Sequence, residues 1–129
     1  MLRKKYFLLF VLLTLSFAQN IFSEDASRYI AQIKNKKEKE TVKISALASL
    51  ALIGGPEAAS AIVAAITDKN PSVRVAAIET LAQLNADAAV PTIGQALEDK
   101  NERVQNKAIW ALGHLGNPKA VPFLTQSFL

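Results

Sequence analysis

The stretch Val73–Leu81, which reads VRVAAIETL, decides the fold because it returns 31 residues later as Val104–Leu112, VQNKAIWAL. The segment Val42–Leu50, VKISALASL, precedes it by the same interval. A fixed period of 20 to 50 residues is typical of solenoid proteins, in which each repeat buries its apolar face against the next one. We therefore expect a repeat architecture.

The aligned copies predict two helices in each repeat. Gly54, Asn85 and Gly116 share one register, and these residue types tolerate the left-handed backbone that commonly ends a helix. Apolar residues recur at helical spacing on both sides of that position. The aligned apolar positions are Leu47, Ile78 and Ile109, then Leu50, Leu81 and Leu112 in the first helix, and Ile62, Ile93 and Leu124, then Ile66, Leu97 and Phe128 in the second.

The short connections fit the same unit. Asn70 and Asn101 are expected to cap the helices that follow them. Pro91 and Pro122 predict a loose first turn in the second helices, because proline lacks an N–H group. The predicted fold class is an all-α solenoid, a right-handed superhelix of about three helix–turn–helix repeats. The repeats span about 41–69, 70–100 and 101–129.

The first 18 residues are predicted to be a signal peptide. Arg3–Lys5 form a basic start, and Tyr6–Phe17 form a 12-residue apolar run. Small residues at Ser16 and Ala18 suit a signal peptidase, although cleavage as late as Ser23 is an alternative. An uncleaved anchor also stays open, but the run is shorter than the roughly 20 apolar residues that a membrane helix needs. The protein is therefore expected to be exported, either periplasmic or secreted.

Residues 19–40 are predicted to form a capping helix and a charged turn. Tyr29, Ile30 and Ile33 make one apolar face that can cover the N-terminal end of the stack. The turn Lys36–Glu40 lacks the asparagine found at the other junctions. A helix that continues into the first repeat is therefore the alternative.

Charge and composition exclude several classes of function. The chain has a net charge of +4, but the leader holds three of the 15 basic residues and none of the 11 acidic ones, which leaves the mature part at +1. A nearly neutral domain does not indicate a nucleic-acid partner. The chain has no cysteine and one histidine, His114, and no residues show metal-ligand spacing. We expect no catalytic, cofactor or metal site, and therefore a protein that is not an enzyme.

The motif Ala111–Leu124, ALGHLGNPKAVPFL, resembles HEAT repeats of the short class named after phycobilisome lyases. The resemblance covers about residues 40–129. It implies a structural ladder of hydrogen bonds in which Asp68 meets Arg74, with Asp99 at the next junction. Gln105 replaces the arginine there, and Arg103 lies nearby. The ladder is thus predicted to be complete at one junction only.

Two surfaces are candidates for binding another protein or a peptide. Trp110 stands where the other copies have Ala48 and Glu79, one turn from both Asn106 and His114. An exposed tryptophan is a frequent binding anchor. The alternative is that Trp110 packs against a terminal neighbour.

The second candidate surface is a groove along the second helices. It is predicted to be mostly uncharged and to end in one aromatic side chain, Phe123. The alternative is that Phe123 covers the end of the stack. The remaining groove residues are Thr92, Gln95 and Gln126.

These observations predict an exported, non-enzymatic interaction or scaffolding module. The family resemblance implies one alternative, a lyase-like or chaperone-like protein that acts on a prosthetic group or its carrier. Phe128 and Leu129 end the chain inside the last predicted helix, without a polar cap. The other alternative is therefore a structural subunit that self-associates through its C-terminal end.

Overall fold

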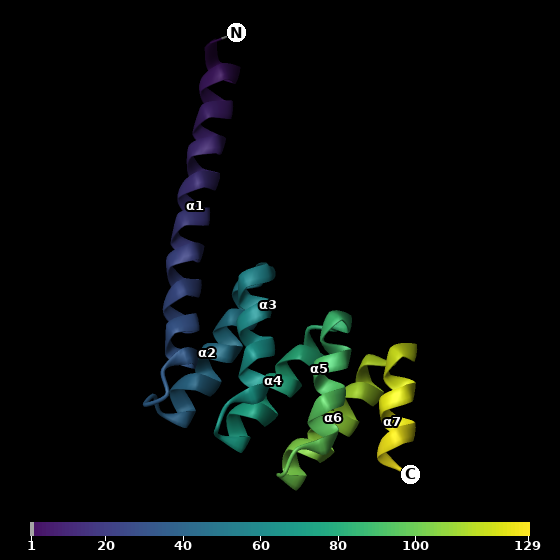
Figure 1. Ribbon diagram of the computed structural model, residues 1–129. Helices are drawn as coiled ribbons and strands as arrows, with labels where there is room; N and C mark the ends of the chain where they lie inside the picture. Colours follow the sequence, from purple (N-terminus) through teal and green to yellow (C-terminus); the bar gives the residue numbers. More distant parts are fainter. Residues whose placement is uncertain (1) are drawn as a thin grey trace.

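The computed structural model describes residues 2–129, and all regular structure in that range is helical. The helices stand in succession from α1 at one end to α7 at the other (Figure 1). Three helix pairs, α2–α3, α4–α5 and α6–α7, correspond to the three predicted repeats. The α-helices are α1 (Leu2–Lys34), α2 (Glu40–Ile53), α3 (Gly55–Ala64), α4 (Pro71–Gln83), α5 (Val90–Gln95), α6 (Glu102–Leu115) and α7 (Val121–Ser127).

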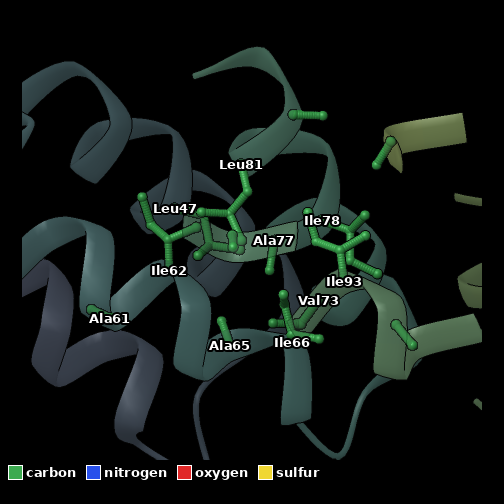
Figure 2. Packing of buried hydrophobic residues seen from close by; sticks show 14 of the residues in the cluster. Leu47, Ala61, Ile62, Ala65, Ile66, Val73, Ala77, Ile78, Leu81 and Ile93 are labelled. Atoms are coloured by element: carbon green, nitrogen blue, oxygen red, sulfur yellow. The ribbon is translucent and has the colours of Figure 1, made fainter. Parts of the chain in front are cut away.

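The core lies between successive helix pairs, at the positions that the 31-residue register aligns. Leucine and isoleucine side chains fill it, and Figure 2 shows them gathered between the helices. Alanines at the neighbouring positions are also buried, which lets the helices approach closely. The largest fully buried side chains are Leu47, Leu50, Ile62, Ile78, Leu81, Ile93, Leu112, Val73, Val90 and Val104.

One predicted core position is wrong. Phe128 is aligned with the buried Ile66, yet 76% of it is exposed. Leu124, one turn earlier, is half-buried. The register places both on the side of α7 that faces away from α5, and no further helix pair covers that side among residues 2–129. Apolar character alone therefore does not bury a residue at the end of a stack.

The junctions have the backbone that their residue types favour. Gly54, Asn85 and Gly116 all have positive φ, at 71°, 50° and 59°. The side chains of Asn70 and Asn101 accept hydrogen bonds from the second N–H group of the helices that they cap. Short 3-10 turns precede α5 and α7, at Asp87–Ala89 (η2) and Pro118–Ala120 (η4), so Pro91 and Pro122 each follow a loosened turn.

Helix α1 has two halves with different surroundings. Its N-terminal half extends beyond the stack, and the large apolar side chains of Tyr6–Phe17 are mostly exposed (Figure 1). Its C-terminal half packs on the repeats, where Ala26 and Ile33 are buried and Ile30 is half-buried. The helix ends at Lys34, and a turn separates it from α2. A helix continuous with the first repeat is therefore wrong.

The boundary of the leader stays a prediction, because α1 runs without a break through residue 18. This helix is long and apolar enough to cross a membrane by length and composition alone. Signal sequences pass the same test, so that finding does not separate a cleaved leader from an anchor.

Candidate functional site

A ladder of polar contacts runs along the turns between the repeats. Lys43 Nζ donates to Asp68 Oδ2 at 2.6 Å. Arg74 forms a two-bond pair with Asp99, from Nε to Oδ2 at 2.8 Å and from Nη2 to Oδ1 at 2.7 Å. Both pairs join the first helix of a repeat to the end of the second helix of the same repeat.

The backbone carbonyls of the two aspartates extend the ladder to the next repeat. Arg74 Nη1 donates to the carbonyl oxygen of Asp68 at 2.9 Å, and Gln105 Nε2 donates to that of Asp99 at 2.6 Å. Each aspartate also accepts the backbone N–H of the capping asparagine two residues later. Each aspartate is therefore a node that holds three chain segments together.

The predicted pairing of Arg74 with the Asp68 side chain is wrong, and so is a ladder with a single complete junction. The carboxylate of Asp68 turns back to its own repeat, where Lys43 meets it, and only its carbonyl faces Arg74. Arg103 is exposed and takes no part, since Gln105 fills the arginine position. Burial explains the fidelity of these contacts, because an unpaired charge at such a position would be costly.

Asp99 shows how strongly the ladder holds its charges. Burial raises the pKa of this carboxyl group, but the hydrogen bonds from Arg74 and the Asn101 backbone, together with the charges of Arg74 and Lys100, bring its pKa below the ordinary value. Among the residues that the structure describes, every buried side-chain nitrogen or oxygen has a hydrogen-bond partner. The ladder groups are thus occupied by one another, which is how a structural element is built.

The predicted tryptophan stripe lies on the outward side of α6. Trp110 is 44% exposed, and its ring stacks on that of His114 at a centroid distance of 5.1 Å. Lys107 Nζ lies 4.6 Å from the centroid of the Trp110 ring, and it also pairs with Glu79 of α4 at 3.4 Å. We call the set Trp110, His114, Lys107, Asn106 and Arg103 the α6 surface.

A shallow cleft of about 500 Å³ adjoins the α6 surface, between α4 and α6. Val75 is the half-buried apolar residue of its wall. The remaining lining residues are Glu79, Arg103, Asn106, Lys107 and Trp110. The sequence alone indicated Trp110, Asn106 and His114, but it gave no sign that Lys107 would sit over the tryptophan.

The second candidate surface is divided in the structure. Thr92 and Gln95 line a pocket of about 470 Å³ beside the ladder. Phe123 and Gln126 line a separate hollow of about 250 Å³ on the far side of α5. Phe123 itself lies against Gly94, so close that a Cβ atom added to that glycine would be 2.5 Å from the ring. The four residues therefore do not form one continuous groove.

Comparison with known families explains the architecture. The family model described as HEAT repeats matches residues 26–91 and again 60–129. The chain belongs to the HEAT-repeat family. Repeats of this family generally mediate contacts between proteins, which suggests an interaction or scaffolding module. The phycobilisome-lyase-like subclass is not confirmed by this match and stays a prediction.

A solved structure shares the fold of this HEAT-repeat protein. Human deoxyhypusine hydroxylase, determined in complex with glycerol, is similar with a TM-score of 0.75 and 23% sequence identity. The match covers 86% of this chain and 39% of the hydroxylase chain, so this chain spans about two-fifths of that protein's length. At this identity the likeness shows the fold alone. No curated protein sequence matches.

The hydroxylase corrects one expectation. The absence of cysteine and of clustered histidines led to the prediction that this protein is not an enzyme. That prediction is contradicted, because a solved structure with the same helical architecture belongs to an enzyme. A stack of HEAT repeats is therefore no argument against catalysis. The comparison assigns no reaction to this chain, and it does not favour the lyase-like alternative.

Proposed function

We propose that this HEAT-repeat protein is an interaction module that binds a protein or peptide partner through the α6 surface. The observation that carries the proposal is the position of Trp110. It is 44% exposed, although the 31-residue register places Ala48 and Glu79 at the equivalent points of the other repeats. Packing of the repeat therefore does not require an aromatic side chain there.

The neighbours of Trp110 support a binding role because they hold its ring in place before any partner arrives. His114 stacks on the ring, and Lys107 lies over it while paired with Glu79. A side chain that is already ordered loses less conformational entropy on binding. Tryptophan is also among the residues that contribute most to interface energies.

The cleft indicates the chemistry of the partner. Trp110 and Val75 offer apolar contact, and Asn106 offers hydrogen bonds. Arg103 has no ion-pair partner among the residues that the structure describes. A peptide segment with an apolar side chain next to an acidic one would satisfy both halves of this surface.

The binding proposal predicts a selective loss of affinity in Trp110→Ala. A partner cross-linked to the protein in its native cells is identified, and its affinity for purified protein is measured. We expect at least a tenfold weaker affinity, about 1.4 kcal/mol, because the variant loses the aromatic anchor. Leu84→Ala is the matched control, since Leu84 is equally exposed at 44% but lies outside the cleft. Equal affinity of wild type and Trp110→Ala would move the site elsewhere.

We also propose that the module acts outside the cytoplasm, with residues 1–18 as its export signal. The division of α1 supports this, because the apolar side chains of Tyr6–Phe17 contribute nothing to the core. Removal of the leader would leave Ala26 and Ile33 in place on the first repeat. The stack would keep its N-terminal cover after cleavage.

Export predicts a shortened chain in the envelope fraction of the native cells. Intact-mass measurement of the purified protein should place the N-terminus between residues 19 and 24. A chain that begins at residue 1 and resists extraction at alkaline pH would point to the membrane anchor instead. A full-length chain recovered in the cytoplasmic fraction would contradict export.

A further inference from the structure

We propose that the outer face of the last helix pair binds the same face of a second copy, giving a dimer with two-fold symmetry. We call this surface, formed by Ile109, Val121, Leu124 and Phe128, the C-terminal face. It lies at the end of the stack opposite α1 (Figure 1). The inference does not depend on the binding role of Trp110.

The 31-residue register shows what this face is built for. In the middle repeat the equivalent residues pack against the following repeat, and Ile78, Val90 and Ile93 are each 0% exposed. In the last repeat Ile109 is 37% exposed, Val121 56% and Phe128 76%. All of them remain large and apolar, whereas a face that stays in water is expected to become polar.

The charges of the face favour a second copy as the occupant. At the inner junction the register positions carry Arg74, which needs Asp99, and Glu79, which needs Lys107. In the last repeat the same positions hold Gln105 and Trp110, which are neutral. A face that carried an unpaired arginine would repel its own copy, but a neutral face can meet itself without that cost.

The other end of the molecule limits the arrangement to tail-to-tail. The N-terminal side of the first repeat is already covered by α1, through Ala26, Ile30 and Ile33. A head-to-tail chain of copies would have to displace that helix. A contact between two C-terminal faces displaces nothing and closes after two copies.

Sedimentation equilibrium of the protein purified from its native cells tests this proposal. We expect a monomer–dimer equilibrium whose dissociation constant rises at least tenfold in Ile109→Asp and in Phe128→Asp. Phe128 is largely exposed, so its variant keeps the test valid if Ile109→Asp does not fold, which circular dichroism reports. Leu52→Asp is the matched control, because Leu52 is 90% exposed on α2, away from the face.

The chain has no cysteine, so a single introduced cysteine reports on the symmetry. Phe128→Cys should form a disulfide-linked dimer on mild oxidation, and Leu52→Cys should not. Trp110→Ala should dimerise and cross-link through residue 128 as well as the wild type, which separates this contact from the partner site. A monomer at all concentrations, a dimer insensitive to both aspartate variants, or a different protein bound to the face would overturn the proposal.

Discussion

Replacing Asp99 by alanine is expected to lower the free energy of unfolding by about 3 kcal/mol. The carboxylate binds Arg74 through two hydrogen bonds and accepts a third from the Asn101 backbone. Arg74 is only 5% exposed, so the variant would leave its charge buried without a partner. We expect the low end of the range for buried pairs, since water reaches part of the Asp99 side chain. Urea unfolding followed by circular dichroism measures the loss.

The matched control is a pair of the same charges in a more exposed place. Glu79 and Lys107 join the same two repeats, but their side chains are 42% and 26% exposed. Glu79→Ala should cost about 0.5 kcal/mol, because solvent screens the pair. Adding Arg74→Met to the Asp99 variant should recover part of the loss, since the stranded charge is removed. If both single variants cost the same, the ladder is not the buried structural element described here.

The dependence on pH has a defined sign. The pKa of Asp99 is lowered in the folded protein, so its contribution is fully present above the unfolded pKa, about 4, and is lost as pH falls through the folded pKa. The wild type should therefore lose stability on acidification below about pH 4 more steeply than Asp99→Asn, whose amide does not titrate in this range. Parallel acid profiles of the two proteins would show that Asp99 does not carry the effect.

The sequence predicts the repeat units well because one signal is read three times. Aligned leucines and isoleucines mark the core, and a residue with positive φ recurs at the end of each first helix. Chance agreement at a single position is common, but agreement at a constant interval of 31 residues is not. The number and order of the helices follow from that interval.

The contacts between the units are less predictable, because a register says which residues are equivalent and not which atoms face each other. Asp68 was expected to meet Arg74 with its side chain, six residues away. In the structure that meeting uses the carbonyl, and the side chain reaches back 25 residues to Lys43. The burial of Phe128 was overestimated for a related reason, since equivalence in sequence does not supply a neighbour in space.

The candidate site shows the same limit. A tryptophan out of register with its equivalents was visible in the sequence, and it drew attention to α6. The clamp formed by Lys107 was not visible, because it depends on Glu79 from the preceding repeat. Likewise, Gly94 stands in register with Val63 and Thr125, and nothing in that series indicates that a phenyl ring will occupy the missing side chain's place.

Replacing Gly94 by alanine is expected to destabilise the C-terminal repeat by about 2 kcal/mol, although alanine is the better helix former. A Cβ atom on Gly94 would lie 2.5 to 2.9 Å from three ring carbons of Phe123. One of these is Cγ, which cannot move away without shifting the whole ring. Helix α7 must then shift away from α5 or Phe123 must leave its place.

Gly113→Ala is the matched control. Gly113 lies inside α6, and a Cβ atom there would meet nothing within 4 Å. That variant should gain about 0.5 to 1 kcal/mol from helix propensity alone. In a Phe123→Ala background Gly94→Ala should also become neutral or stabilising, because the ring that it meets is gone. The reversal of sign identifies the contact as the cause.

The place of the loss matters as much as its size. Contacts in a repeat stack join nearest neighbours, so the damage should appear in α5–α7 and leave α2 unchanged. Amide hydrogen exchange resolved along the chain measures this. If Gly94→Ala leaves exchange in α7 unchanged, Phe123 does not depend on the glycine and is free to meet a partner, which would restore the continuous groove along the second helices. Faster exchange confined to α5–α7 would assign Phe123 to the packing of the last repeat and leave the α6 surface as the binding site.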